Sequence, residues 1–324
     1  AQRQADDGVR RQWPGSYFEA RFRGREAWLH VGEGEQALQV QVDDAPPATL
    51  VRPAPGYYRI GGLGAGAHRV RVDVVSESQA GPSVFGGFHV PRGAALPPPP
   101  RRARQIELIG DSHTVGYGNT SATGECTTDQ VWRTTNTARG IAGLLGGRYR
   151  ADTRVHAISG RGVVRNYAGG PGDTVPAAYP FVLFDRRVAD TAAGWHPQLI
   201  VVALGTNDFS TALKPGERWR DRDALHADFE ARYAAFVRDL RRRNPGARIV
   251  IWATDMAQGE IAAEAGKVAA RLRAEGDRRI GFVRVPGLAL SGCHMHPSVA
   301  DDRVIADAVA AHVDAQPGGF PRPR

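Results

Sequence analysis

The chain has 324 residues, of which 42% are apolar and 23% charged, a composition typical of a folded globular protein. It lacks an apolar run of about eighteen residues, the length that a membrane-spanning helix needs, so we expect no membrane partner. The formal charge of +8 comes almost entirely from arginine, because Lys214 and Lys267 are the only lysines. No nucleic-acid-binding motif accompanies that charge, which argues against a nucleic-acid partner.

The N-terminus and the cysteines bear on where the protein works. Residues 1–7 do not form a signal peptide, although they fit the mature end left after one is removed. Cys126 and Cys293 are the only cysteines, and they fit either one disulfide of a secreted protein or two unrelated buried thiols. We expect a secreted or periplasmic protein whose signal peptide has been cleaved.

Residues 1–96 are predicted to form an all-β domain, a β-sandwich of jelly-roll type. Apolar and polar side chains alternate within residues 18–22, 38–42 and 70–74, and Gly, Pro and Asp turns separate these runs. The proline- and arginine-rich residues 97–103 are a stiff linker without a core of their own. We expect no exposed aromatic cluster on these strands, and therefore no independent glycan-binding face.

Residues 104–324 are predicted to form an α/β domain with a parallel sheet between two layers of helices, the three-layer flavodoxin-like arrangement. Expected strands cover residues 106–109, 153–158, 199–204, 248–252 and 280–285, and expected helices cover residues 225–240, 261–272 and 299–313. Ligands of such sheets bind beyond the carboxyl ends of the strands, so the turns that follow the strands are where a site is expected.

Four residues in or near such turns suit acyl-transfer chemistry. Ser112 follows the first strand, Gly160 the second and Asn207 the third, while His296 precedes the last helix. A serine becomes a nucleophile when a base takes its proton and nearby donors stabilise the oxyanion. Each residue alone also fits an ordinary turn, cap or surface position. Their joint occurrence, in order and close to sheet ends, favours a serine hydrolase.

Around these residues the sequence resembles the SGNH (GDSL-type) hydrolases. The similarity lies in four blocks, at residues 110–112, 159–160, 205–208 and 296–297. Two longer stretches, Ile109–Asn119 and Gly292–Ser298, resemble carbohydrate esterase family 2. Three segments of the first domain, Trp13–Ser16, Ala67–His68 and Phe85–Phe88, are similar to the β-sandwich of that family. The resemblance extends over nearly the whole chain.

The resemblance implies a deacetylase of xylan- or mannan-type polysaccharide or oligosaccharide that works through an acyl-serine and needs no metal or cofactor. Ser112 would be the nucleophile and His296 the general acid and base. The N–H groups of Ser112 and Gly160, with the Asn207 side chain, would form the oxyanion hole; Gly162 is an alternative to Gly160. Two carboxylates, those of Asp111 and Asp208, are expected to brace their turns.

The sequence departs from the SGNH pattern close to His296. Many of these hydrolases have an aspartate three residues before the histidine, where this chain has Cys293. We therefore predict a Ser–His dyad whose histidine is held by a backbone carbonyl, with Asp255 as an alternative carboxylate partner. His294 and His296 also resemble a metal-binding pair. A third ligand is not evident, so we predict no metal site.

If Ser112 and His296 meet, Cys126 and Cys293 lie near each other, and we hypothesise a disulfide between them; two free thiols remain the alternative. Aromatic side chains suit the flat C–H faces of sugars. Tyr117, Tyr167 and Trp195 are candidate substrate-binding residues because they lie near the motifs, whereas Trp132 is interpreted as a core residue.

Two other functions compete with deacetylation of carbohydrate. A lipase or thioesterase would use the same four blocks on longer acyl esters. The loop 167–180 is polar and lacks the bulky apolar side chains of an acyl channel. A non-catalytic carbohydrate-binding protein would not need Ser112, Asn207 and His296 together. Deacetylation of carbohydrate is the function that the sequence favours, and an acetylated glycan is the expected partner.

Overall fold

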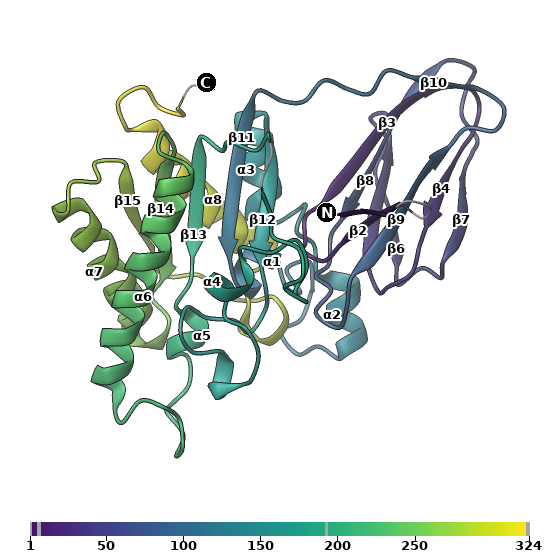
Figure 1. Ribbon diagram of the computed structural model, residues 1–324. Coiled ribbons are helices and arrows are strands. Elements are labelled where there is room, and N and C mark those ends of the chain that lie inside the picture. The colour runs from purple at the N-terminus through teal and green to yellow at the C-terminus, as the bar shows by residue number, and fades with distance from the viewer. Residues whose placement is uncertain (1, 5–7, 192–193, 322–324) are drawn as a thin grey trace.

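A computed structural model describes residues 2–4, 8–191 and 194–321. Two parts lie side by side, an all-β part and an α/β part, and an extended segment along one edge joins them (Figure 1). The last strand of the first part ends at Leu96 and the first strand of the second begins at Arg104. Within the N-terminal segment considered above, residues 1 and 5–7 lie outside the described residues.

Two antiparallel sheets of five strands form the β-sandwich, as predicted. The first sheet has the order β1 (Gln2–Gln4), β2 (Gly8–Arg11), β9 (Ser83–His89), β4 (Ala27–Val31) and β7 (Gly56–Ile60). The second has the order β10 (Ala94–Leu96), β3 (Tyr17–Arg23), β8 (Ala67–Val74), β5 (Ala37–Val42) and β6 (Ala48–Val51). The core between them contains Leu29, Val31, Leu38, Val72 and Val74. Alternation with period two produced this arrangement, because every second side chain faces the opposite sheet.

We expected no exposed aromatic cluster on the strands of the sandwich. That expectation is wrong, because a tyrosine and two histidines form an exposed ring cluster on the first sheet. Tyr57 is 57% exposed, and its ring stacks on His30 at 4.4 Å and meets His89 edge-on at 5.1 Å. His30 and Tyr57 are register partners on β4 and β7. The cluster could not be predicted from the sequence, because its members come from three strands that are distant along the chain.

The α/β part is built on a parallel sheet of five strands. Their order is β12 (Ala151–Ala157), β11 (Arg104–Gly110), β13 (Leu199–Ala203), β14 (Arg248–Thr254) and β15 (Ile280–Val285). All neighbouring pairs run parallel, so the carboxyl ends of the strands meet at one edge. The five predicted strands are confirmed. β13 is buried along its whole length, as expected for a strand covered on both faces.

Helices cover both faces of this sheet. Apolar side chains of α6 (Arg222–Arg243) and α7 (Glu260–Ala274) pack on one face, and those of α3 (Ile141–Tyr149) and α8 (Val299–Asp314) on the other. The turns at the strand ends contain α1 (Ser112–Val115), α4 (Val175–Ala178), α5 (Thr206–Phe209), η1 (Tyr167–Gly169), η2 (Ala257–Gly259) and η3 (Cys293–Met295), and α2 (Thr128–Thr134) lies between α1 and α3. Among the described residues, no helix has the length and apolar character that crossing a membrane requires.

The sandwich packs directly on the α/β part. Trp13 joins a small buried cluster with Ile158 and Ala178, and its indole N–H donates to the Phe181 carbonyl at 2.9 Å. Tyr17 donates to Asp152 at 2.6 Å. These contacts hold the start of β3 and the residues before it against β12 and the turn that follows β12, which is one of the turns with a predicted site residue.

Candidate active site

Ser112 lies on a tight turn at the carboxyl end of β11. Asp111 caps the short helix α1 by accepting the His113 backbone N–H at 3.1 Å. A Cβ at Gly110 would lie 2.1 Å from Thr114 Oγ1, so the close turn requires glycine there. The turn holds the Ser112 side chain, which is 5% exposed, at the edge of the sheet. Its hydroxyl points to the last part of the chain.

His296 reaches Ser112 from the turn before α8. Its Nε2 lies 2.8 Å from Ser112 Oγ, and its Nδ1 lies 2.8 Å from the Cys293 carbonyl and 3.1 Å from the His294 carbonyl. Because carbonyl oxygens only accept hydrogen bonds, Nδ1 carries the proton of the neutral ring. Nε2 then has a free lone pair that accepts the Ser112 hydroxyl. The backbone thereby selects the tautomer that a general base needs.

The surroundings favour the neutral form of His296. Burial lowers its pKa below the ordinary 6.5, although hydrogen bonds to the Cys293 and His294 carbonyls oppose that shift. His113 lies edge-on to His296 with the ring centres 5.6 Å apart, and burial lowers the pKa of His113 to about 3. Neither imidazole therefore carries a charge at neutral pH, and His296 is ready to accept a proton.

Gly160 presents open space beside the turn after β12. Its φ is +79°, a conformation that favours glycine, and no atom lies within 4 Å of where a Cβ would stand. Gly162, the alternative, donates its N–H to Asn166 at 3.3 Å, and a Cβ there would overlap Asp208. Of the two glycines, Gly160 is therefore the one beside which a substrate oxygen has room.

Asn207 lies on α5, directly after β13. Its amide nitrogen donates to Asp111 Oδ2 at 3.1 Å and to the Arg161 carbonyl at 3.0 Å. These bonds link the turns that follow β11, β12 and β13. Both amide hydrogens are used, so an oxyanion here would share or replace one of these acceptors.

The two aspartates next to the site residues brace the turns, as expected. The Asp208 carboxylate accepts the backbone N–H groups of Val163, Val164 and Arg165 at 2.9–3.1 Å. Burial raises the pKa of Asp111 to about 7 and that of Asp208 to about 6. The hydrogen bonds of both carboxylates hold neighbouring turns in place, which is a structural role.

The side chains of Asp255 and His294 form hydrogen bonds with groups other than the His296 ring. Asp255 accepts the Gly287 N–H at 3.3 Å, while the described partners of His296 Nδ1 are the two carbonyls. The His294 ring lies 2.8 Å from the Cys126 carbonyl through Nε2 and 3.1 Å from the Tyr117 hydroxyl through Nδ1. Both ring nitrogens of His294 are therefore occupied by protein partners.

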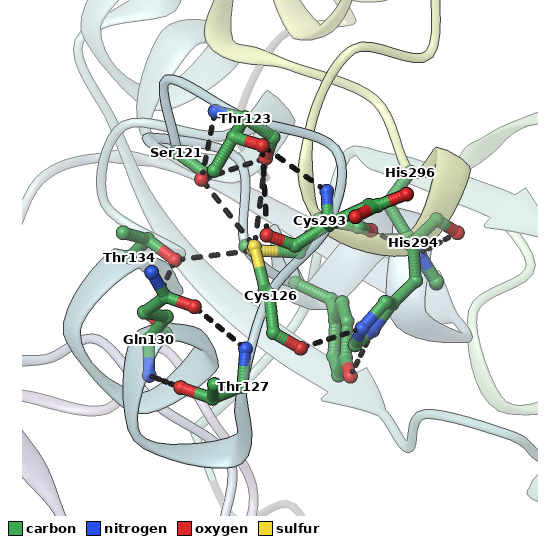
Figure 2. Close-up of a disulfide and its surroundings, with 12 residues drawn as sticks. Ser121, Thr123, Cys126, Thr127, Gln130, Thr134, Cys293, His294 and His296 are labelled. Atoms are coloured by element: carbon green, nitrogen blue, oxygen red, sulfur yellow. Dashed lines mark hydrogen bonds between the residues drawn. A yellow bond between two sulfur atoms is a disulfide. The ribbon is translucent and has the colours of Figure 1, made fainter.

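A disulfide joins Cys126 to Cys293, as hypothesised from the sequence (Figure 2). It fastens the turn that carries His296 to the segment that follows α1. The contact is close, because a Cβ at Gly118 would lie 2.3 Å from Cys293 Cβ. Gly118 also has a φ of +58°, so two constraints require glycine at this point.

The aromatic candidates divide into those near the site and one far from it. The Tyr117 ring packs on His296 at 4.4 Å, and the Tyr167 N–H donates to the Gly160 carbonyl at 2.8 Å. Tyr167 is 56% exposed beside that turn. Trp195 precedes β13 and lies beside Arg154, at the amino edge of the sheet. Its assignment to the site is wrong, because a neighbour of Asn207 in sequence can lie a whole strand away.

Three further residues near the site were misassigned or missed. Trp132 is half-buried and lines a cavity with Tyr117, so its interpretation as a core residue is wrong. Glu77 and Gln79, from the loop between β8 and β9, bind the N–H and the carbonyl of Ser159 at 2.9 and 3.0 Å. No local motif marks these two residues, because only the packing of the two domains brings them to the turn with Gly160.

Family models match both parts of the chain. Residues 1–100 match the model described as carbohydrate esterase 2 N-terminal, and residues 108–307 match the GDSL-like lipase/acylhydrolase family. An acetylxylan esterase/glucomannan deacetylase of Cellvibrio japonicus is 40% identical over 94% of this chain and 85% of that protein.

Solved structures agree with these matches. A carbohydrate esterase whose active site displays divergent catalytic and non-catalytic binding functions has a TM-score of 0.90 and 38% identity over 98% of this chain and 96% of that one. A family two carbohydrate esterase from Clostridium thermocellum, in complex with cellohexaose, has a TM-score of 0.84 and 29% identity over 95% and 94% of the two chains.

The fold and the site define a GDSL-like acyl hydrolase with a β-sandwich in front of it. Within that class the chain belongs to carbohydrate esterase family 2 and is a carboxylic ester hydrolase.

Proposed function

We propose that this protein is a serine esterase that removes O-acetyl groups from xylan- or mannan-type polysaccharide or from its oligosaccharides. The observation that carries the proposal is the 2.8 Å contact between Ser112 Oγ and His296 Nε2, with Nδ1 of the same ring held by carbonyls. Two relatives support the substrate class: the acetylxylan esterase/glucomannan deacetylase and the esterase in complex with cellohexaose.

The reaction proceeds by two displacements. His296 takes the Ser112 hydroxyl proton as Oγ attacks the acetyl carbonyl carbon. The negative charge that develops on the carbonyl oxygen is received by the N–H groups of Ser112 and Gly160 and by the Asn207 amide. The C–O bond to the sugar breaks, and His296 gives its proton to the leaving sugar oxygen. Acetyl-Ser112 remains.

Water completes the cycle. His296 takes a proton from water as the hydroxide oxygen attacks the acetyl-Ser112 carbonyl, and the same oxyanion donors receive the charge. The bond to Oγ breaks, the proton returns from His296 to Ser112, and acetic acid leaves and ionises to acetate in the solvent. Throughout, the Cys293 and His294 carbonyls orient the imidazole. These carbonyls stabilise the imidazolium less than a carboxylate would. The catalytic group is therefore a dyad of Ser112 and His296, without an anionic third member.

We also propose that the protein works outside the cytoplasm, in the periplasm or the surrounding medium. The support is the disulfide between Cys126 and Cys293, since such bonds persist in oxidising compartments. A polysaccharide substrate fits the same location.

Acetate release from acetylated xylan and acetylated glucomannan tests the activity, with wild type compared with Ser112→Ala. We expect the wild type to release acetate from at least one polymer and the variant to release none above background. Cleavage of longer acyl esters without acetate release would instead indicate a lipase or thioesterase. Binding to either polymer without any ester cleavage would indicate a carbohydrate-binding protein.

A further inference from the structure

A cavity of about 300 Å³ lies between the β-sandwich and the α/β domain. Glu77, Gln79 and Ala80 line it from the sandwich, and Tyr117, Trp132 and His294 line it from the α/β domain. Its size is at the lower end of the range for small-molecule sites, and interfaces between domains are a common place for them. None of the predicted roles of Ser112, Gly160, Asn207 or His296 uses this space.

The cavity adjoins both halves of the catalytic machinery. On one wall, the Tyr117 ring lies 4.4 Å from the His296 ring. On the opposite wall, Glu77 accepts the Ser159 N–H at 2.9 Å and Gln79 donates to the Ser159 carbonyl at 3.0 Å. Ser159 directly precedes Gly160. A ligand in the cavity is therefore next to the turns that carry the base and an oxyanion donor.

The walls combine flat apolar surface with hydrogen-bonding groups. Trp132 and Tyr117 are both half-buried, so part of each ring is open to a ligand. The Arg52 guanidinium lies 5.7 Å from the Trp132 ring centre and pairs with Asp129 at 2.9 Å, which holds the indole in place. A pyranose matches such walls, because it has C–H faces for the rings and hydroxyls for the polar groups.

The polar lining favours a neutral sugar over other ligands. Glu77 bonds Ser159 through Oε2 and Gln79 bonds it through Nε2. A long acyl chain would cover the other side-chain oxygen of each residue without giving it a hydrogen bond, which is unfavourable. A uronate would bring its negative charge close to Glu77. A neutral sugar avoids both penalties, because its hydroxyls can donate to the remaining side-chain oxygens of Glu77 and Gln79.

We propose that this cavity is a subsite that binds a neutral pyranose unit of the glycan, next to the unit whose acetyl ester Ser112 attacks. The subsite rests on the proposed function. It assigns the β-sandwich a direct part in substrate recognition, because Ser76, Glu77, Gln79 and Ala80 line the cavity from its loop between β8 and β9.

Two substrates test the subsite, an acetylated glucomannan oligosaccharide and 4-nitrophenyl acetate, which has no sugar to occupy the cavity. For Trp132→Ala we expect KM for the oligosaccharide to rise about tenfold, the effect of losing one aromatic contact. Its kcat/KM for 4-nitrophenyl acetate should equal that of the wild type, which also shows that the variant folds. Tyr57→Ala is the matched control: it removes an exposed ring from the sandwich face and should leave KM unchanged.

A second variant tests the subsite even if Trp132→Ala does not fold. Ala80 is exposed at the cavity wall, so Ala80→Trp obstructs the space without removing a packed side chain. It should raise KM for the oligosaccharide in the same way. An unchanged KM in both cavity variants, with acetate release intact, would overturn the subsite alone. Equal losses on both substrates, or an equal rise in KM with Tyr57→Ala, would also overturn it. A wild type that cleaves only longer acyl esters would overturn the proposed function and the subsite with it.

Discussion

Ser112 lies on a turn that the sheet and buried carboxylates hold, whereas His296 lies on a turn held by a disulfide and backbone carbonyls. Around Ser112, the Asp111 and Asn207 side chains connect the ends of three neighbouring strands. Around His296, the Nδ1 partners are the Cys293 and His294 carbonyls. One turn derives its geometry from the core of the fold, and the other from a disulfide to a distant segment of the chain.

The backbone of the second turn is strained. His294 and Met295 have φ values of +53° and +60°, in the left-handed region that side chains other than glycine adopt at a cost of about 1–3 kcal/mol each. The Cys126–Cys293 bond and the contacts of the His294 ring with Tyr117 and the Cys126 carbonyl offset that cost. Strain at this point lets consecutive carbonyls converge on one imidazole nitrogen. Because the two turns are held by different interactions, we expect substitutions in them to have different effects.

Removing the disulfide should have the largest effect. For the double variant Cys126→Ser, Cys293→Ser we expect the free energy of unfolding to fall by about 2–5 kcal/mol, because the bond closes a long loop. We also expect kcat to fall about ten- to a hundredfold with little change in KM, since the carbonyls that orient His296 lose their anchor. Denaturant unfolding measures the loss of stability, and steady-state kinetics on 4-nitrophenyl acetate measure the loss of kcat.

Ser121→Ala is the control, because it keeps the disulfide and removes a hydroxyl that lies 3.4 Å from Cys126 Sγ. A folded double variant with wild-type kcat would contradict this account of the histidine turn.

Removing the Asp208 carboxylate, which holds the turn after β12, should mainly affect stability. Asp208→Ala leaves three backbone N–H groups without their acceptor, so we expect the free energy of unfolding to fall by about 3 kcal/mol. Asp208→Asn keeps one acceptor oxygen and should lose less. Urea unfolding of the two variants gives the comparison. Equal stability of Asp208→Ala and wild type would show that the brace has no energetic role.

The pH dependence should follow the imidazole. Neutral His296 accepts the serine proton and protonated His296 cannot, so kcat/KM falls as the pH drops through the pKa of the ring. Burial lowers that pKa, and the neutral form therefore persists to lower pH. We expect the acid limb of the profile to have its midpoint below 6.5. A midpoint above 6.5 would indicate an anionic partner that stabilises the imidazolium.

The smallest effect is expected at Asp255. Because its described contact is the Gly287 N–H, Asp255→Asn should leave kcat and the midpoint of the acid limb unchanged. The same pair of measurements on wild type is the reference. A large loss of kcat in this variant would mean that Asp255 completes a triad during the reaction.

The sequence predicted the fold where periodicity was strong. The all-apolar run of β13 and the helical spacing within α6 each indicated one element, and both exist. The helix α3 was missed. Its stretch Ile141–Tyr149 contains three glycines, at 143, 146 and 147, which weaken the helical signal, while packing on the sheet supplies the stability.

The site was predictable where its residues follow buried strands or precede a capped helix. Ser112 and Asn207 directly follow strand ends, and His296 precedes the capping box of α8, so local patterns locate all three. The positions of Trp132, Glu77 and Trp195 could not be obtained in this way. The first two meet only because the domains pack together, and Trp195 lies at the opposite edge of the sheet despite its closeness to Asn207 in sequence.

Trapping the acyl-enzyme shows directly whether Ser112 is the nucleophile. The wild type is mixed with 4-nitrophenyl acetate, quenched in acid within the first turnover, reduced and digested with trypsin. The peptide between Arg104 and Arg133 contains Ser112 and Ser121, and fragmentation in a mass spectrometer distinguishes them. We expect one acetyl group on Ser112 of the wild type and none on the same peptide of Ser112→Ala. Full release of 4-nitrophenol without acetylation of Ser112 at any quench time would contradict this expectation.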